Sequence, residues 1–365
     1  MNQWPRILRS PDDLAGQFLF AGVEGTSLGP DLRRRLDAVR PGGIILFSRN
    51  IEEAAQVGAF CRELHSSLPV PPFLAIDQDG GRVSRLKGIL PPIPANLSMA
   101  RASRPDALVR EHGSQTGWAL ALLGFNLNFA PVLDLSGAES PNGIGDRAYG
   151  TDPEEVGRLA RIFLEAQESA GVPGCGKHFP GLGGGTVDSH VDLPRIDRSA
   201  DEMWREDLLP YRRLRDVLPM VMVGHAHYPS LQGGEPRPAS LSREVVAGLL
   251  RERIGYRGVV ITDDLEMGAV DRRRPAGEVV LDALDAGNDM VMYCNSWGRV
   301  EEAHAALASA LKAGTLSSAR IESSLSRILA LKEQLPPPGR APLFDPAPFG
   351  EVCRNLGRLE EVLRS

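Results

Sequence analysis

The chain has 365 residues, 42% of them hydrophobic, and a formal net charge of −6. This length and apolar content are sufficient for one large domain or two modest ones with a well-buried core. The basic residues are scattered along an acidic chain, which argues against a nucleic-acid-binding protein. The four cysteines are far apart and form no Cys-x-x-Cys pair, so neither a disulfide framework nor a zinc ribbon is expected.

No segment has the pattern of a targeting or membrane-spanning sequence. Residues 1–10 are polar and charged and lack the apolar core of a signal peptide. The most apolar stretch, residues 118–135, is interrupted by glycine, asparagine, proline and aspartate, which is not the pattern of a membrane span. We therefore expect a cytoplasmic protein with no membrane partner.

Short β-rich apolar runs alternate with helical stretches along the chain. The apolar runs predict strands at residues 17–23, 42–47, 73–77, 125–135, 172–179, 219–228, 258–265 and 289–295. The helical stretches are residues 30–39, 51–66, 105–123, 153–170, 200–217, 242–254, 276–286, 297–313 and 317–333.

A strand followed by a helix, repeated eight times, is the pattern of a (β/α)₈ barrel. No Gly-x-Gly-x-x-Gly follows an early strand, as it would in a dinucleotide-binding sheet. The sequence therefore predicts an α/β fold, a single-domain (β/α)₈ TIM-type barrel over residues 1–335. A Pro-rich C-terminal extension, residues 336–365, is expected to pack a short helix on the barrel.

Polar and titratable residues gather where the predicted strands end. In a barrel these ends converge on one face, which is where the active site of such folds lies. Ordinary turn residues are the alternative interpretation for Asp134 and Asn295. The full set is Asp77, Asp134, Lys177, His178, His225, His227, Asp263 and Asn295.

The stretch 177–190 carries the strongest signal for a site. It begins with Lys177 and His178 at a strand end, passes through three consecutive glycines, and ends in Asp188-Ser189-His190. Three glycines have too much backbone freedom for a helix or strand interior, so a mobile loop is expected. A carboxylate close to an imidazole fixes its tautomer and raises its basicity, as a general acid/base needs. The alternative is a surface loop whose aspartate caps the next helix.

Two adjacent carboxylates, Asp263 and Asp264, end the strand at 258–265. Neighbouring strand residues point in opposite directions, so we expect one carboxylate to face the barrel axis and the other to cap the following segment. A carboxylate opposite an imidazole suits double displacement at an anomeric carbon. The second role, usually a carboxylate's, would fall to His190, because an imidazole can act as acid and then as base near neutral pH.

These motifs together resemble glycoside hydrolase family 3, specifically its single-domain β-N-acetylhexosaminidase branch. The resemblance extends from about residue 14 to residue 335. The segments that carry it, in the order of the family, are 76–83, 128–134, 144–147, 177–181, 188–190 and 262–265.

The resemblance implies that Asp263 is the nucleophile, His190 the acid/base and Asp188 its dyad partner. The residues that would bind the non-reducing-end sugar are Asp77, Arg85, Arg147, Lys177 and His178, and we expect His225 to line the pocket as well. No cofactor or metal is implied. The expected activity is that of a retaining exo-β-N-acetylglucosaminidase acting on small saccharides with terminal β-N-acetylglucosamine. By resemblance these substrates are muropeptide fragments in cell-wall recycling.

The sequence departs from the family pattern at two positions. Leu182 stands where the loop commonly has a histidine, and Asp79 stands where a glutamate is usual. We expect the first change to affect the loop or the leaving-group subsite. The second shortens a carboxylate that supports the sugar-binding residues.

Three other functions are consistent with parts of this pattern. His225 and His227, with His178 and Asp263, could form the metal site of a barrel hydrolase, although such enzymes usually place a His-x-His pair on the first strand. A sugar-binding protein without catalysis is a second alternative, made less plausible by the presence of Asp263 with the Asp188/His190 pair. A third is phosphorolysis, because a histidine, unlike a carboxylate, does not repel phosphate.

Overall fold

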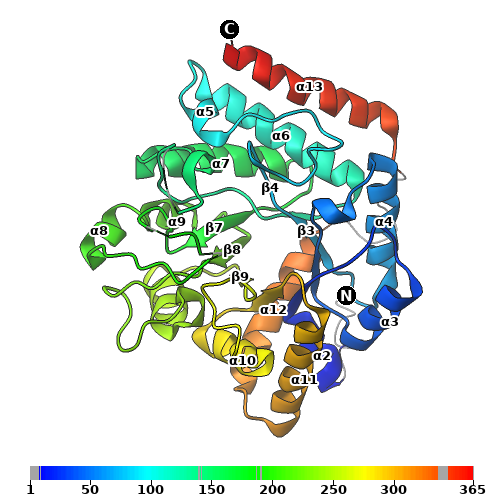
Figure 1. Cartoon of the computed structure of the whole chain (residues 1–365), viewed down its shortest axis with the longest axis vertical. Coiled ribbons are helices and arrows are strands. Elements are labelled where there is room, and N and C mark those ends of the chain that lie inside the picture. The colour runs from blue at the N-terminus through cyan, green and yellow to red at the C-terminus, as the bar shows by residue number, and fades with distance from the viewer. Residues whose placement is uncertain are drawn as a thin grey trace.

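The computed structural model describes residue 8 and residues 10–138, 140, 142–185, 187–189, 191–335 and 344–364 (Figure 1). Within these residues, parallel strands form one eight-stranded sheet. The strands are β1 (Leu19–Gly22), β2 (Gly43–Ile45), β3 (Phe73–Ile76), β6 (Leu127–Asn128), β7 (Cys175–Phe179), β8 (Met220–Val223), β9 (Val259–Asp264) and β10 (Met290–Tyr293). Each of them falls within a run that the sequence predicted as a strand.

The sheet closes on itself to form a barrel. Its order is β6-β3-β2-β1-β10-β9-β8-β7, and all neighbours in this order pair in parallel. Isolated parallel bridges join the outer strands, from Asn128 to Gly174 and from Val132 to Lys177. The strands thus follow one another around the ring in chain order, and the predicted (β/α)₈ TIM-type barrel is confirmed.

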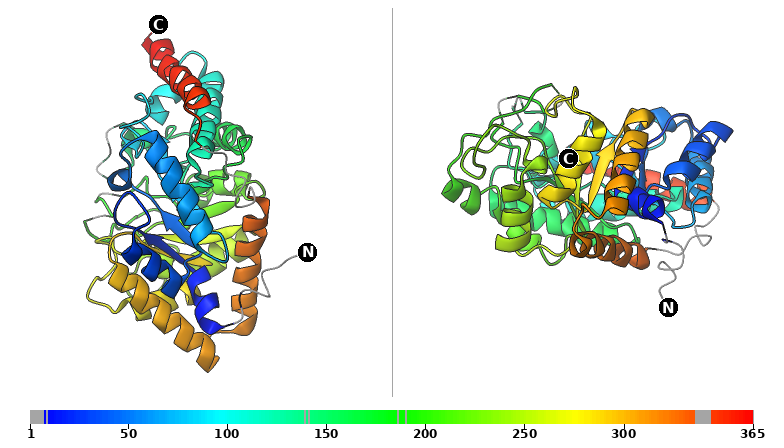
Figure 2. Two further views of the ribbon diagram at one scale, coloured as in Figure 1. Left: turned by 90° about the vertical axis from the view of Figure 1, so that its right-hand side faces the viewer. Right: turned by 90° about the horizontal axis from the view of Figure 1, so that it is seen from below.

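Helices cover the outside of the barrel (Figures 1 and 2). Those that match predicted segments are α3 (Pro30–Val39), α4 (Ala54–Ser67), α6 (Pro105–Leu123), α7 (Pro153–Glu168), η4 (Glu244–Arg253), α10 (Ala276–Ala286), α11 (Trp297–Ala313) and α12 (Ser318–Gln334). Of these, η4 is a π-helix. The helix predicted at 200–217 is instead divided into α8 (Ala200–Arg205) and α9 (Leu209–Leu214). Pro210, which cannot occupy a helix interior, lies in the first turn of α9 and explains the break.

Several short elements were not predicted from the sequence. Helix α2 (Pro11–Gln17) precedes the first strand and is stabilised by a capping box between Ser10 and Asp13. An antiparallel hairpin of β4 (Gln78–Gly80) and β5 (Val83–Ser84) follows β3, and α5 (Asn96–Ala100) follows that hairpin. The hairpin matters for the site because it carries Asp79 beside the end of β3.

Aromatic side chains fill the barrel interior. Phe20 stacks on Phe73 at a centroid distance of 6.0 Å and packs against Phe129 at 5.5 Å. A side chain at Gly43 would place its Cβ 2.3 Å from the Phe20 ring, so only glycine fits beside this ring. The Lys332 ammonium group lies 5.2 Å from the centre of the Phe73 ring, and burial lowers the pKa of Lys332 to about 7. The interior is therefore a packed core and not a channel.

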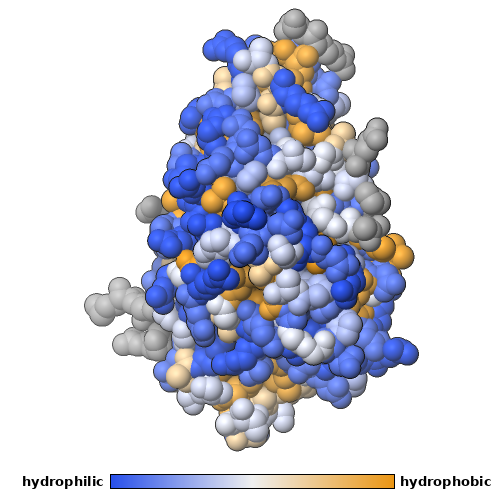
Figure 3. All heavy atoms as spheres, turned by 90° about the vertical axis from the view of Figure 1, so that its left-hand side faces the viewer, coloured by the Kyte–Doolittle hydropathy of each residue, from blue (hydrophilic) through white to orange (hydrophobic). Residues whose placement is uncertain are grey.

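The C-terminal helix α13 (Pro346–Arg364) packs against α6 at one end of the molecule (Figures 1 and 2). It is longer than the short helix expected from the sequence, and it buries Phe349, Val352 and Leu356. None of the helices in the described part of the chain is long and apolar enough to cross a membrane. The face in Figure 3 is mostly hydrophilic, with smaller hydrophobic groups between the charged side chains.

A buried carboxylate fastens α12 to the barrel. Asp289, fully buried before β10, accepts hydrogen bonds from the Val260 amide at 2.9 Å and the Ser324 hydroxyl at 2.6 Å. It also pairs with Arg251 and, at 2.7 Å, with Arg327. Burial opposes its ionisation, but the guanidinium of Arg251 and the bonds from Arg327 and Ser324 hold the pKa of Asp289 below its usual value.

We predict that Asp289→Ala lowers the free energy of unfolding by about 3–5 kcal/mol, because it leaves partly buried guanidinium groups without their counter-charge. Urea unfolding would measure the change. Asp271→Ala is the matched control, since Asp271 pairs with a highly exposed Arg273 and should contribute nothing measurable. Equal loss of stability in both variants would show that the buried cluster has no special role.

Candidate active site

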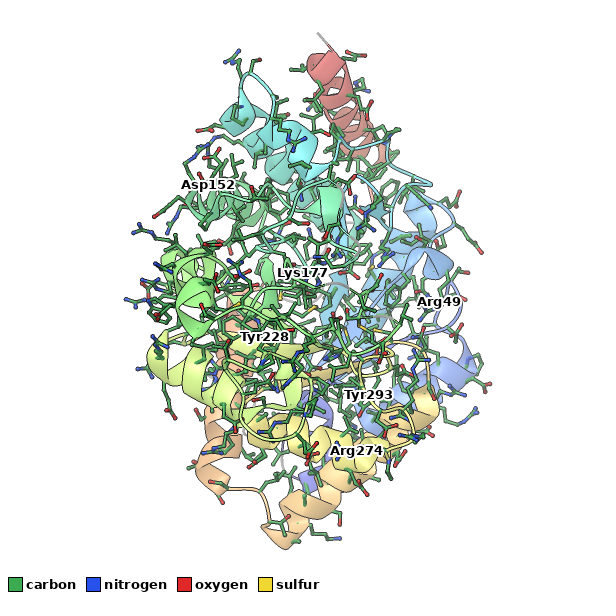
Figure 4. All side chains as sticks on the ribbon, turned by 60° about the vertical axis from the view of Figure 1, so that its left-hand side comes forward. Arg49, Asp152, Lys177, Tyr228, Arg274 and Tyr293 are labelled. Atoms are coloured by element: carbon green, nitrogen blue, oxygen red, sulfur yellow. The ribbon has the colours of Figure 1, made fainter. Side chains whose placement is uncertain are left out.

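A cavity of about 500 Å³ opens where the barrel strands end, a size suited to a small-molecule ligand. Its walls come from segments that are far apart in the sequence. Figure 4 labels Lys177 near the middle of the molecule and Arg49 among the blue N-terminal elements. The charged residues and the histidine that line the cavity are Arg49, Asp77, Arg82, Arg85, Arg147, Lys177, His178, Asp188, Asp263 and Asp264.

A network of ion pairs centred on Lys177 forms one wall. The Lys177 side chain is 1% exposed, and its Nζ lies 2.8 Å from Asp77 Oδ1 and 3.0 Å from Asp79 Oδ1. Arg147 donates to Asp79 Oδ2 at 2.9 Å, and Arg85 lies 3.5 Å from Asp77 Oδ2. The four predicted sugar ligands on this wall, Asp77, Arg85, Arg147 and Lys177, are thus held together.

Mutual pairing keeps these buried groups charged. Burial alone would favour neutral Lys177, but the carboxylates of Asp77 and Asp79 raise the pKa of Lys177 above its usual value. Burial likewise opposes the charge on Asp77, yet Lys177 and Arg85 hold the pKa of Asp77 well below its usual value. The wall therefore presents charged donors and acceptors in fixed positions, which suits the recognition of sugar hydroxyls.

Asp79 has a defined place despite being shorter than the family's usual glutamate. Its side chain is fully buried and bridges Lys177 and Arg147. It stands on the β4–β5 hairpin, which was not predicted from the sequence. The Asp79 carboxylate therefore holds in place two cations that line the cavity, Lys177 and Arg147.

His178 is held by a buried aspartate that the sequence pattern left as a possible turn residue. Asp134 Oδ2 lies 2.7 Å from His178 Nδ1 and accepts the His178 backbone N–H at 3.2 Å. Asp134 Oδ1 accepts the Leu182 backbone N–H at 2.7 Å. The turn interpretation of Asp134 is therefore wrong, because its carboxylate joins a cavity residue to the base of the glycine loop.

The base of the glycine loop is held from a second side by Asn142. Its Nδ2 donates to the carbonyl oxygens of Leu182 at 2.9 Å and Gly183 at 2.8 Å. A side chain at Gly183 would place its Cβ 1.8 Å from the Leu135 carbonyl oxygen, so this glycine allows a close backbone approach. Leu182, in place of the usual histidine, is buried and packs toward Gly224.

The outer part of the loop brings Asp188 to the cavity wall. A side chain at Gly143 would place its Cβ 2.8 Å from Asp188 Oδ2, and Gly143 has a φ of +76° that favours glycine. The Ala269 backbone N–H donates to the Ser189 carbonyl at 3.0 Å, which ties the loop to the segment after β9. His190, the predicted acid/base, lies outside the described residues, and its role stays a prediction.

Asp263 and Asp264 both line the cavity, which corrects the expectation that only one would face it. The pairing of β9 with β10 shifts register between Met290 and Met292, so strict alternation is lost near the end of β9. Asp263 Oδ1 accepts the Asp264 backbone N–H at 2.8 Å.

Asp264 also organises the neighbouring backbone, as expected for the second carboxylate of the pair. Its Oδ1 accepts the backbone N–H groups of Glu266 at 3.0 Å and Cys294 at 3.2 Å. Burial, together with the charges of Glu266 and Asp263, raises the pKa of Asp264 to about 7.

His225 does not have the pocket-lining place that we expected. It is buried, its Nδ1 lies 2.8 Å from Ser240 Oγ, and its Nε2 donates to the Asp264 carbonyl at 3.0 Å. His225 is not among the described residues that line the cavity. The hydrogen bonds occupy both ring nitrogens, which leaves no lone pair for a metal.

His227 is not among the described residues that line the cavity, and its backbone pairs with the segment at 194–196. Within the described ranges, no group of three or more His, Cys, Asp or Glu side chains is arranged to hold a metal ion. The geometry of the two histidines therefore does not support the metal-hydrolase alternative.

Two arginines in the cavity wall were not singled out from the sequence. Arg49 Nη2 donates to the Cys294 carbonyl at 2.6 Å, and its guanidinium lies 4.6 Å from the centre of the Phe47 ring. Arg82 donates to the carbonyl oxygens of Gly143 and Ile144 and pairs with an exposed aspartate. The available signal for Arg49 was its place two residues after the predicted strand at 42–47.

Comparison with known proteins agrees with this geometry. The model of the glycosyl hydrolase family 3 N-terminal domain matches residues 25–331. A beta-hexosaminidase of Thiobacillus denitrificans is 39% identical over 284 residues, which are 76% of this chain and 78% of that protein. A beta-hexosaminidase of Pseudomonas aeruginosa is 39% identical over 293 residues, which are 79% and 86% of the two chains.

Solved structures show the same relationship. A family 3 beta-N-acetylglucosaminidase from Paenibacillus superposes with a TM-score of 0.86 and 34% identity, covering 96% of this chain and 68% of that one. Native NagZ from Neisseria gonorrhoeae superposes with a TM-score of 0.75 and 28% identity, covering 94% and 97%. The protein described here belongs to glycoside hydrolase family 3 and is a glycoside hydrolase built on a single (β/α)₈ barrel.

Proposed function

We propose that the protein is a retaining exo-acting β-N-acetylglucosaminidase that removes terminal β-N-acetylglucosamine from small saccharides. The observation that carries the proposal is that two sets of groups line one cavity. Asp263 and Asp188 line it, and so does the ion-paired wall of Lys177, Asp77 and Arg147. The names of the similar proteins, beta-hexosaminidase and beta-N-acetylglucosaminidase, support the choice of sugar.

In the proposed reaction, Asp263 attacks C1 of the terminal sugar while the bond from C1 to the leaving oxygen breaks. His190 gives its proton to that oxygen, and a glycosyl-aspartate forms. His190 then takes a proton from water, whose oxygen attacks C1 and releases Asp263. Asp188 would hold the imidazole in the required tautomer. The hydrogen bond from the Asp264 amide to Asp263 Oδ1 would orient the nucleophile.

The proposed ligands of the sugar are Asp77, Arg85, Arg147, Lys177 and His178. A pyranose ring offers several hydroxyl groups that need donors and acceptors at fixed positions. Ion pairs and buried hydrogen bonds set those positions before the substrate arrives. Less conformational freedom is then lost on binding, which favours affinity and alignment of C1 with Asp263.

We further propose that the natural substrates are peptidoglycan fragments, whose aglycones carry carboxylates. Arg49 supports this choice because its short hydrogen bond goes to a carbonyl oxygen. Among the described residues, the carboxylate with which it forms an ion pair is that of the mostly exposed Glu24, 3.9 Å away. A guanidinium so weakly neutralised can pair with an anionic group. Cell-wall recycling is the setting that we propose, on the resemblance of the sequence motifs to the family.

Trapping the covalent intermediate tests the proposed reaction most directly. Treatment with a 5-fluoro N-acetylglucosaminyl reagent, followed by peptide mass spectrometry, should place one sugar on Asp263. Asp263→Asn should take up no label and should lose roughly 10³-fold or more in turnover, since the nucleophile is removed. Near-normal turnover by this variant, or a label elsewhere, would contradict the assignment. Comparing sugar-1-phosphate with free sugar in phosphate buffer separates phosphorolysis from hydrolysis.

Substrates with different leaving groups test the proton donor. His190→Ala should lose much more activity on alkyl glycosides than on 2,4-dinitrophenyl glycosides, because only the poor leaving group needs a proton. The measurement is kcat/KM for both substrates in both proteins. An equal loss on the two substrates would argue against His190 as the acid.

An anionic aglycone should reveal the part played by Arg49. We predict that Arg49→Leu raises KM about tenfold more for a β-N-acetylglucosaminide with a carboxylate-bearing aglycone than for its amide counterpart, a difference of about 1.4 kcal/mol. Arg34→Leu, on an exposed part of α3, is the control for loss of a positive charge. Equal changes for both substrates in Arg49→Leu would remove the support for an anionic aglycone.

A further inference from the structure

One fully buried carboxylate, Asp134, contacts two parts of the candidate site, the end of β7 and the base of the glycine loop that follows it. One oxygen, Oδ2, lies 2.7 Å from His178 Nδ1 and accepts the His178 backbone N–H. The other oxygen, Oδ1, accepts the Leu182 backbone N–H at 2.7 Å. Among the described residues, no arginine or lysine forms a salt bridge with it, and the His178 ring is the titratable group in direct contact with it.

The contact with the ring determines which nitrogen of His178 carries a proton. A carboxylate can only accept a hydrogen bond, so the 2.7 Å contact requires a proton on Nδ1. Nε2 is then the nitrogen that the ring can turn toward the cavity that His178 lines. In the neutral ring, this Nε2 is an acceptor for a sugar hydroxyl.

The contact with Leu182 fixes the point where the glycine loop leaves the barrel. Asn142 holds the carbonyl oxygens of Leu182 and Gly183, while the Asp134 carboxylate holds the Leu182 amide. Gly183 also lies directly against the backbone of Leu135, the neighbour of Asp134. Segment 134–135, which follows β6 at a distance of a few residues, thus holds the start of the loop that extends to Asp188.

We propose that Asp134 is a positioning residue that aligns the sugar-binding imidazole and the base of the Asp188 loop with a single carboxylate. This role rests on the proposed glycosidase function, since both parts that it holds serve the same substrate. The same side chain then holds both the sugar ligand and the start of the loop.

Asp207 provides the contrast that separates this role from simple stabilisation. It is also buried near the loop base, where a side chain at Gly181 would place its Cβ 2.9 Å from Asp207 Cβ. Its carboxylate pairs with Arg198 at 2.7 Å and does not line the cavity. Loss of Asp207 should therefore affect stability, whereas loss of Asp134 should affect catalysis as well.

A double-mutant cycle tests the contact with His178. Asp134→Asn should lower kcat/KM for 4-nitrophenyl β-N-acetylglucosaminide about 10- to 100-fold, in line with other residues that orient a working histidine. In a His178→Ala background the same change should cost at least tenfold less, because the ring that it positions is gone. Asp207→Asn is the control for lost stability. Its kcat/KM is compared with that of Asp134→Asn together with the melting temperatures of both variants. Equal losses from Asp134→Asn in both backgrounds would overturn the proposal.

The contact with the loop has a separate readout. In the His178→Ala background, the loss that Asp134→Asn still causes should be greater for an alkyl glycoside than for a 2,4-dinitrophenyl glycoside, because the loop would carry the proton-donating dyad. The same loss on both substrates would overturn this half of the proposal and with it the shared role.

A measurement on the unmodified protein covers the case in which Asp134→Asn does not fold. Long-range ¹H–¹⁵N NMR correlation of the histidine rings should show His178 with a proton on Nδ1. A ring protonated on Nε2 alone would overturn the proposal. The NMR result does not depend on turnover. Failure of the proposed function would instead appear as a wild-type enzyme that is inactive on aryl β-N-acetylglucosaminides, so the two failures can be distinguished.

Discussion

The burial of the Lys177 ammonium group is the constraint on which both the barrel and its cavity depend. Its backbone closes the ring, because the Lys177 carbonyl accepts the Leu133 N–H at 2.7 Å and its own N–H donates to Pro131 at 3.2 Å. Its side chain is 1% exposed, and a buried charge is tolerated only when it is paired. Asp77 and Asp79 must therefore reach the same point. The residue whose backbone hydrogen bonds close the barrel therefore also brings together the side chains of one wall of the site.

The resulting distribution of charge suits the cleavage of a glycosidic bond. Three cations on the Lys177 wall, Lys177, Arg85 and Arg147, are balanced by two carboxylates, so this wall can bind hydroxyl groups without a large net field. The reacting carbon becomes positively charged in an oxocarbenium-like transition state. Carboxylates that are not engaged in the cationic wall are what such a state needs nearby. Asp263 lines the same cavity without being part of the Lys177 network.

The barrel could be predicted from the sequence because buried parallel strands produce continuous apolar runs, and helices produce a different period. In a barrel, the carboxyl ends of the strands meet on one face. The predicted topology was therefore enough to place Asp77, Lys177, His178 and Asp263 at the same end of the barrel. The roles of residues that act through long-range contacts could not be obtained in this way. His178 Nδ1 and the Asp134 carboxylate are 44 positions apart in the sequence, and nothing in the local pattern near residue 134 distinguishes this bond from an ordinary turn. The joint exposure of Asp263 and Asp264 depends on a register shift that only the pairing of two strands reveals.

The run of three glycines shows how one composition can have two physical meanings. From the sequence it indicated backbone freedom, because glycine lacks the side chain that restricts its dihedral angles. In the structure, Gly183 has no positive φ, but an added Cβ would lie 1.8 Å from the Leu135 carbonyl oxygen. Its role is close packing, which fixes the start of the loop. A fixed base would limit the positions that the proposed Asp188/His190 dyad farther along the loop can sample, so we infer that the absence of a side chain at Gly183 favours a defined loop position over mobility.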